Sequence, residues 1–438
     1  MSLSTQFEWR NENAFSAGSL IRESRSFTHS YAWKLSEWNS LSSSLDVTFR
    51  NKKYTPTFKS LGNNDISTVL VRNQSRFTPF NRGIETDLFY EVATQRSSRL
   101  ERVFVRVAVG TGNYKYLGDL NNNGVADESE FVLTRFDGDY IAITVPSDQL
   151  YPVIDLKTSV RLRIIPSRLL STQGSVWGDL LNAVTSETYV RVEEKSSEPD
   201  LKKIYLLHFS RFQSDSTIAG STYFTEDVNF FEGRPEFNAR LRFSQRKGLA
   251  KFASSSSSGI QERNFTRERS LRLRWQLVAE IANQIDLVNR NDRVSSTEGS
   301  SRLRDIESNT MAFDLSYRPY QHVETGMKFE VGKSTDKHLS PAVNANLNTQ
   351  SMRLVYAFQG AGQARVEASR EEILLSRTTD ILPFELTGGR VPGKTYLWRA
   401  AFDYRVTHFI QATLNYDGRT EGGRPPVHTA RAEVRAFF

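Results

Sequence analysis

Long segments that alternate apolar and polar side chains with a period of two dominate this sequence, and they limit the folds open to it. In residues 269–279, Leu271 and Leu273 fall on one face of an extended chain, and Arg272 and Arg274 fall on the other. Such alternation is typical of β-strands whose two faces meet different environments. Because comparable segments recur along the whole 438-residue chain, we expect an all-β protein.

The segment lengths and the connections between them indicate a transmembrane β-barrel. Many segments run for about 9–12 residues, which exceeds a soluble strand and matches one that crosses a bilayer. Tight connections at 318–321, 360–363 and 405–408 alternate with long polar ones. We predict the long connections at 247–267, 291–308, 333–348, 376–394 and 417–427. Short connections at one end of the strands and long ones at the other predict an antiparallel barrel. The number of alternating segments predicts roughly 16–20 strands.

The composition agrees with a barrel, because only half of each strand must be apolar when the other half faces water. Hydrophobic residues make up only 38% of the chain, although aromatic residues reach 11%. A sheet in hydrocarbon must also close on itself to satisfy its backbone hydrogen bonds. The alternative is a large soluble β-protein, such as a solenoid or stacked sandwiches, which predicts shorter strands and unsorted loops.

Charge and cysteine content exclude several classes of protein. The chain has no cysteine, so disulfides and thiolate metal sites are excluded. The net charge of +7 is spread along the chain, and we expect no nucleic-acid partner. The first residues lack a charged leader followed by an apolar core, so no signal peptide is predicted.

One stretch differs from the rest and predicts a small β-rich insert, on the rim of the barrel or folded into its mouth as a partial plug. Several glycines and acids interrupt the alternation there. We therefore divide the chain into N-terminal barrel strands at 1–109, an insert at 110–156, and C-terminal barrel strands at 157–438.

The insert contains a twelve-residue match to the calcium loop of an EF-hand, with Gly124 at the position of the sharp turn. Its flanks look like strands rather than helices, so we predict a structural Ca²⁺ site and not a calcium sensor. Asparagine replaces two acids, which predicts weak affinity, in the range of about 10⁻⁴–10⁻³ M. The alternative is an Asn- and Gly-rich turn that binds nothing. The predicted ligands are Asp119, Asn121, Asn123, Asp127 and Glu130, with the backbone carbonyl of Val125.

The polar strand faces carry many arginines, and we predict that they face the lumen. They are Arg240, Arg242, Arg272, Arg274, Arg353, Arg365, Arg399, Arg431 and Arg435. An excess of arginine would favour anions in an open lumen. In the alternative interpretation, arginine–carboxylate ladders only tie neighbouring strands together, and both roles can hold at once.

The end of the chain, VHTARAEVRAFF, alternates and stops on an aromatic residue. It resembles the last strand of outer-membrane β-barrels of Gram-negative bacteria, in which Val434, Ala436 and Phe438 would form the signal read by the barrel-assembly machinery. The resemblance implies a bacterial outer-membrane location, contact with outer-membrane lipid, short turns in the periplasm and long loops outside the cell.

A second resemblance covers about residues 80–235, including the stretches LERVFVRVAVGTGNYKYLGDL and STIAGSTYFTEDVNFFEG. These stretches look like segments of large uncharacterised outer-membrane proteins of diderm bacteria. The resemblance implies that the barrel is the C-terminal part of a longer exported chain.

No catalytic motif such as HExxH or GxSxG occurs in the sequence, so we do not expect an enzyme. The first hypothesis for function is a pore or the membrane part of a transport or secretion system. The alternative is a surface-display or adhesion protein that the barrel anchors. The third hypothesis is an outer-membrane enzyme. Its only candidate catalytic residues are His338 with Asp336, and His428.

Overall fold

A computed structural model describes the chain, and most of the described residues lie in one antiparallel sheet. Residues 17, 121, 123, 125, 127, 170–177, 179–180, 198–212, 253–259, 298–302, 359, 378–381 and 438 lie outside the description. Twenty strands are present in the described residues, and all except β6 and β7 follow one another in chain order across the sheet, which leaves eighteen. The predicted all-β barrel class and strand number are confirmed.

The first strands and short helices are β1 Ser2–Ser16, β2 Ser19–Trp38, β3 Leu41–Tyr54, α1 Pro56–Ser60, β4 Ile66–Phe77, α2 Pro79–Arg82, β5 Ile84–Arg106, β6 Gly112–Tyr116, β7 Phe131–Gly138, β8 Tyr140–Ile164, α3 Pro166–Leu169, β9 Val184–Ser196 and β10 Thr217–Phe230. The later elements are β11 Phe237–Phe252, β12 Ile260–Val278, β13 Ile281–Ser296, β14 Arg304–Tyr320, β15 Val323–Asp336, β16 Val343–Phe358, β17 Gly362–Leu375, α6 Phe384–Thr387, β18 Gly393–Arg405, β19 Ile410–Glu421 and β20 Val427–Ala436. Among the described residues, no helix is long and apolar enough to cross a membrane.

The register of the strands gives the sheet one apolar and one charged face. Leu241 pairs with Leu271, Leu271 with Leu287, and Leu287 with Met311. These side chains lie on the outer face, where Leu241, Leu287 and Met311 are 40–46% exposed to solvent in the isolated chain. A row of exposed hydrophobic side chains of this length is expected only where lipid or a partner covers it.

The connections divide by length between the two ends of the sheet. One end, the short-turn end, has two- to six-residue joins such as 279–280, 321–322 and 406–409, with the longer segment 165–183 as its exception. The opposite end, the long-loop end, carries the insert between β5 and β8 and the segment 376–392. The insert therefore lies on the side where the long loops lie, which the sequence alone left open.

The predicted long connections are shorter in the structure than the sequence indicated, and this part of the prediction is wrong. The connection expected at 247–267 shrinks to 253–259, and the one expected at 291–308 shrinks to 297–303. Residues such as Glu262 and Arg263 are polar on both faces, so they break the alternation without ending the strand. Backbone pairing continues past the apolar band because it does not depend on which side chains the strand carries.

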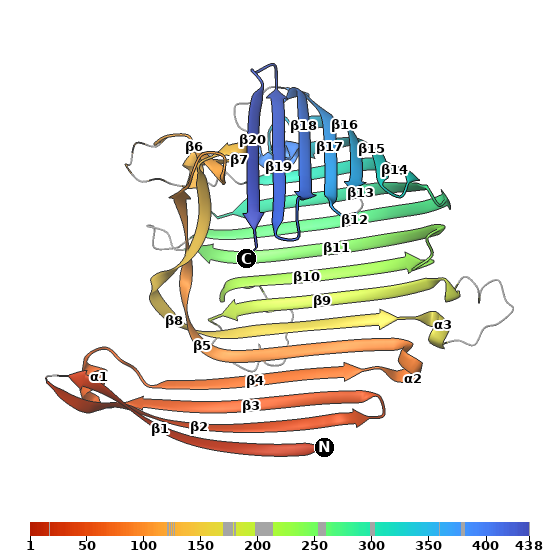
Figure 1. Cartoon of the computed structure of the whole chain (residues 1–438). Coiled ribbons are helices and arrows are strands. Elements are labelled where there is room, and N and C mark those ends of the chain that lie inside the picture. Colours follow the sequence, from red (N-terminus) through yellow and green to blue (C-terminus); the bar gives the residue numbers. More distant parts are fainter. Residues whose placement is uncertain are drawn as a thin grey trace.

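The two outermost strands of the sheet are β1 and β20 (Figure 1). Each pairs along one side only, β1 with β2 and β20 with β19, and no pairing between the described residues joins β1 to β20. Neighbouring strands of the sheet run in opposite directions. The first and the last of the eighteen strands, β1 and β20, therefore also run in opposite directions.

Candidate functional site: a strap across the arginine face

A long hairpin bends away from the wall at the long-loop end of the sheet. β5 and β8 pair from Ile84–Ile164 to Arg106–Tyr140, with a register shift between Ser98 and Leu100. Beyond this shift, Leu100 lies next to Phe252 of β11. We call residues 100–146, which include the β6–β7 hairpin, the strap. β8 begins inside the predicted insert 110–156 and continues into the wall as one strand.

The strap has an aromatic core of its own. The rings of Phe104 and Phe131 stack with centroids 3.8 Å apart and planes 4° apart. Tyr114, Tyr116 and Tyr140 pack around them at centroid distances of 5.0–5.2 Å. Aromatic contacts of this kind add to the stability supplied by burial alone, so the strap is a folded unit rather than an irregular loop.

The far end of the strap docks on the charged face of β17 and β19. Arg135 donates to Glu371 at 2.7 Å, and Arg419 donates to Asp137 at 2.7 Å. The Arg419 guanidinium also lies over the ring of Phe136, 4.4 Å from its centroid. Since the strap rests on this face, this face is the inside of the curved sheet.

The near end of the strap is anchored to β11 and β12. The Arg102 guanidinium lies 3.5 Å from Glu262 and sits over the Phe252 ring, 4.4 Å from its centroid. Arg102 also pairs with Glu128 within the strap. The strap is thus held at β11–β12 and at β17–β19, and it spans the space between these parts of the wall (Figure 1).

A second segment, 382–392, folds onto the inner face beside the strap. Glu385 of α6 lies 3.0 Å from Arg304, which also donates to Asp292 at 2.6 Å. Leu386 is buried in a cluster with Ile306 of β14 and Val343 of β16. Further along the segment, the Arg390 guanidinium lies 3.3 Å from Glu371. The segment and the strap therefore share one carboxylate on the wall.

A partly open chamber of about 620 Å³ lies between the strap and the wall. Arg135 and Phe136 line it from the strap, and Arg353 and Arg399 line it from the wall. The lining mixes charged side chains with apolar ones such as Leu397. A solute with both an anionic and an apolar part would find partners for each in this space.

All nine arginines predicted to face the lumen lie on this inner face in the strand register. Seven have a carboxylate within ion-pair distance, namely Arg242, Arg272, Arg353, Arg365, Arg399, Arg431 and Arg435. Arg274 donates to the amide oxygen of Gln284 at 2.8 Å. Among the described residues, Arg240 has neither kind of partner, and its direct cross-strand neighbour is Arg272.

The candidate calcium loop joins β6 to β7 within the strap, and its residue Glu128 pairs with Arg102 at the near end. Asn121, Asn123, Val125 and Asp127 lie outside the described residues, so only Asp119 and Glu130 can be placed. Glu130 is fully buried and accepts the N–H of Leu120 at 2.8 Å. Asp119 accepts the N–H of Gly124 at 2.8 Å, and Gly124 has the positive φ of 71° that the turn requires. In the part of the chain that the structure describes, no group of three metal-binding side chains occurs.

The Tyr116 hydroxyl lies near the two placed acids of the loop. Burial, together with the charges of Glu130 and Asp119, raises the pKa of the Tyr116 hydroxyl above its usual range. A cation in the loop would offset the negative charges of Asp119 and Glu130. The strands on both sides keep these two acids at the ends of one turn.

The remaining sequence candidates lie apart from the strap contacts just described. Asp336 is fully buried and accepts the backbone N–H of His338 at 2.9 Å, and His428 shares a 2.8 Å hydrogen bond with Tyr416. Val434 and Ala436 pair with β19, whereas Phe438 lies outside the described residues.

Sequence reasoning missed the residues that dock the strap. Arg135 and Glu371 are 236 positions apart, and nothing near either of them in the sequence points to the other.

Comparison with known proteins gives matches among solved structures alone. No protein-family model matches the sequence, and no curated protein matches it. Similar solved structures include OccK11 of Pseudomonas aeruginosa, with 9% identity, a TM-score of 0.36, and coverage of 100% of this chain and 95% of that one. The outer-membrane protein OpdK of the same organism has 12% identity, a TM-score of 0.38 and coverage of 99% and 98%.

The FrpB iron transporter of Neisseria meningitidis has 9% identity and a TM-score of 0.40, with coverage of 98% of this chain and 62% of that one. Similarity at these TM-scores carries no conclusion about function. The chain's own features define its class: eighteen long antiparallel strands, an apolar outer face and a charged inner face. The protein therefore has the fold of a transmembrane β-barrel, as predicted.

Proposed function

We propose that the protein is an outer-membrane channel, or the membrane part of a transport system, whose lumen the strap narrows. The observation that carries the proposal is the docking of the strap on the inner face at β11–β12 and at β17–β19. A loop ion-paired inside a charged lumen sets the size and charge of what passes. A barrel that serves only as an anchor has no need of such a loop.

The solutes that pass are anionic. Arg240 supports this, because a guanidinium without a carboxylate partner, beside Arg272, is available to an anion in the lumen. Seven of the other eight inner arginines have a carboxylate within ion-pair distance, and they add mainly to the cohesion of the wall. Passage through a channel also requires a continuous wall, and the opposite directions of β1 and β20 permit them to pair.

The test of the channel is planar-bilayer conductance of the refolded chain. We expect discrete openings with a reversal potential that favours anions in a salt gradient. An absence of conductance, together with binding of a surface partner that depends on the long loops, would support the surface-display function instead. Closure is tested separately with cysteine pairs on β1 and β20, since the native chain has no cysteine and disulfides form only at Cα distances below about 7 Å.

We also propose that Ca²⁺ stiffens the loop that joins β6 to β7 in the strap. The burial of Glu130 and the turn at Gly124 support a cation between the ends of the loop. Thermal unfolding in Ca²⁺ and then in chelator tests this, and equal unfolding temperatures would argue against it. At ten to a hundred times the dissociation constant, binding adds about 1.4–2.7 kcal/mol to stability.

A further inference from the structure

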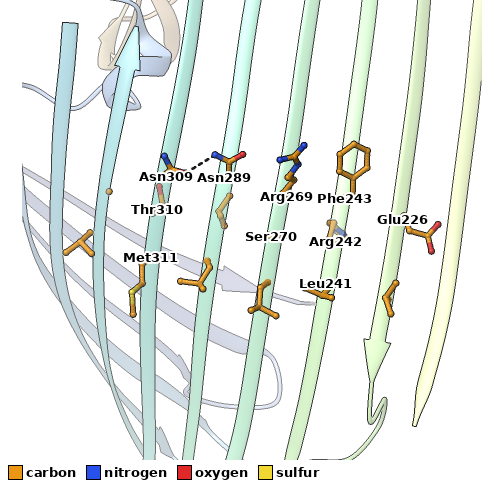
Figure 2. A pocket seen from close by; sticks show the side chains of 16 residues that line it. Glu226, Leu241, Arg242, Phe243, Arg269, Ser270, Asn289, Asn309, Thr310 and Met311 are labelled. Carbon is orange, nitrogen blue, oxygen red and sulfur yellow. Dashed lines mark hydrogen bonds between the residues drawn. The ribbon is translucent and has the colours of Figure 1, made fainter. Parts of the chain in front are cut away.

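The outer face of β11–β15 changes from apolar to polar across one line. Figure 2 shows the apolar row that contains Leu241 and Met311, with a second row of Phe243, Arg269, Asn289 and Asn309 beside it on the same face. The second row is also in register, because Phe243 pairs with Arg269, Arg269 with Asn289, and Asn289 with Asn309. It lies two residues nearer the long-loop end of each strand, about 7 Å away.

The two rows line a shallow groove of about 830 Å³ on the outer face. Its apolar floor consists of Val228, Leu241, Leu271, Leu287, Met311 and Val331. Along its polar margin, Asn289 donates to the side-chain oxygen of Asn309 at 2.8 Å (Figure 2), and this bond uses one of the four amide hydrogens of the pair. A groove with this division suits an amphipathic molecule lying along the strands.

The polar margin has positive charge that the protein does not neutralise. Arg269 and Lys333 have no carboxylate within ion-pair distance among the described residues, and Lys333, which lies beside the groove lining, is paired in register with Asn309. The nearest acid in the groove, Glu226, is bound by the hydroxyls of Ser186 and Thr188. Elsewhere on this face, Arg370 pairs with Glu372 at 2.7 Å and Arg293 pairs with Asp305 at 2.7 Å.

We propose that this groove binds a lipid of the outer leaflet that carries a phosphate monoester. Its acyl chains lie on the apolar row, and its phosphate lies between Arg269 and Lys333, where the asparagine amides donate to it. Charge complementarity favours this occupant, because a phosphate supplies the anion that Arg269 and Lys333 lack. The site rests on the membrane class of the protein and not on the proposed channel.

The experiment counts lipids bound to the full chain refolded in a zwitterionic detergent, by native mass spectrometry. Phosphatidic acid and phosphatidylcholine with the same acyl chains are titrated in turn. We expect the native chain to bind phosphatidic acid more tightly than phosphatidylcholine. We expect the affinity for phosphatidic acid to fall about fivefold in R269Q or in K333Q, and about 25-fold in the double variant, which corresponds to about 1 kcal/mol for each charge. R370Q removes an ion-paired arginine from the same face, so it serves as the matched control and keeps wild-type binding.

Retention of binding by R269K/K333R, with heat-modifiable mobility on gels, establishes that the charges and not the fold account for any loss. Equal affinity of R269Q/K333Q and the native chain for phosphatidic acid would overturn the proposal. An equal loss in R370Q would do the same. Complete displacement by inorganic phosphate at the lipid's own concentration would point to an anion site without lipid specificity. Conductance is expected to stay unchanged in R269Q/K333Q, which separates this test from that of the channel.

Discussion

Replacing Arg135 with glutamine tests whether the strap controls the lumen. The change keeps the length of the side chain but removes the charge that holds β7 to β17. Arg135 approaches Glu371 with two nitrogens, at 2.7 and 3.4 Å. Glu371 retains Arg390 at 3.3 Å, so no carboxylate is left without a partner.

The expected size of the effect follows from the burial of this pair. The side chain of Glu371 is 6% exposed and that of Arg135 is 29% exposed, so solvent screens the pair only in part. A hydrogen bond between charged groups contributes about 1.5–3 kcal/mol, and the exposure of Arg135 places this one near the lower value. A loss of about 1.5 kcal/mol lowers the ratio of docked to released strap roughly tenfold.

Single-channel recording measures that ratio as the time spent at low and high conductance. In R135Q, we expect the ratio of the time spent at high conductance to the time spent at low conductance to be about tenfold larger than in the native chain. R365Q is the matched control, because it removes the same charge from the same face while its partner Glu367 lies on its own strand, 2.5 Å away. Identical recordings from R135Q and R365Q would refute the idea that the strap is the constriction.

Three further outcomes are expected. R240Q lowers the anion-to-cation permeability ratio about twofold or more, whereas R242Q/D227N, which removes an ion pair without changing net charge, leaves the reversal potential in place. L386A costs about 2–3 kcal/mol of docking for segment 382–392, and faster proteolysis after Arg390 than in the native chain measures it. E130Q keeps the acceptor for Leu120 but loses the charge, so its unfolding temperature no longer differs between Ca²⁺ and chelator, whereas E128Q retains the native response.

Strand positions were predictable from the sequence because alternation is a local property. In the segment 269–279, Arg272 and Arg274 alternate with leucines, and in the strand register they share one face with the other seven arginines. Loop lengths were overestimated where both faces are polar, as around Glu262 and Arg263, since alternation marks the apolar band and not the end of the strand.

The candidate calcium loop shows both what the sequence could predict and what it could not. Its spacing in the sequence led to Asp119 and Glu130, because ligand order within twelve residues is a local pattern. Its place on the long-loop side was not predictable, since that depends on the number of strands between residue 110 and residue 235.

By itself, the sequence determined that this chain forms long two-faced strands, one face for lipid and one for water, because side chains alternate along any extended backbone. Only the tertiary structure determined which segment crosses the inner face and which charged side chains of the outer face have no ion-pair partner. Arg135 meets Glu371, and Arg269 lacks any carboxylate, because of how strands far apart in the chain are brought together by register and curvature. No local pattern encodes those distances.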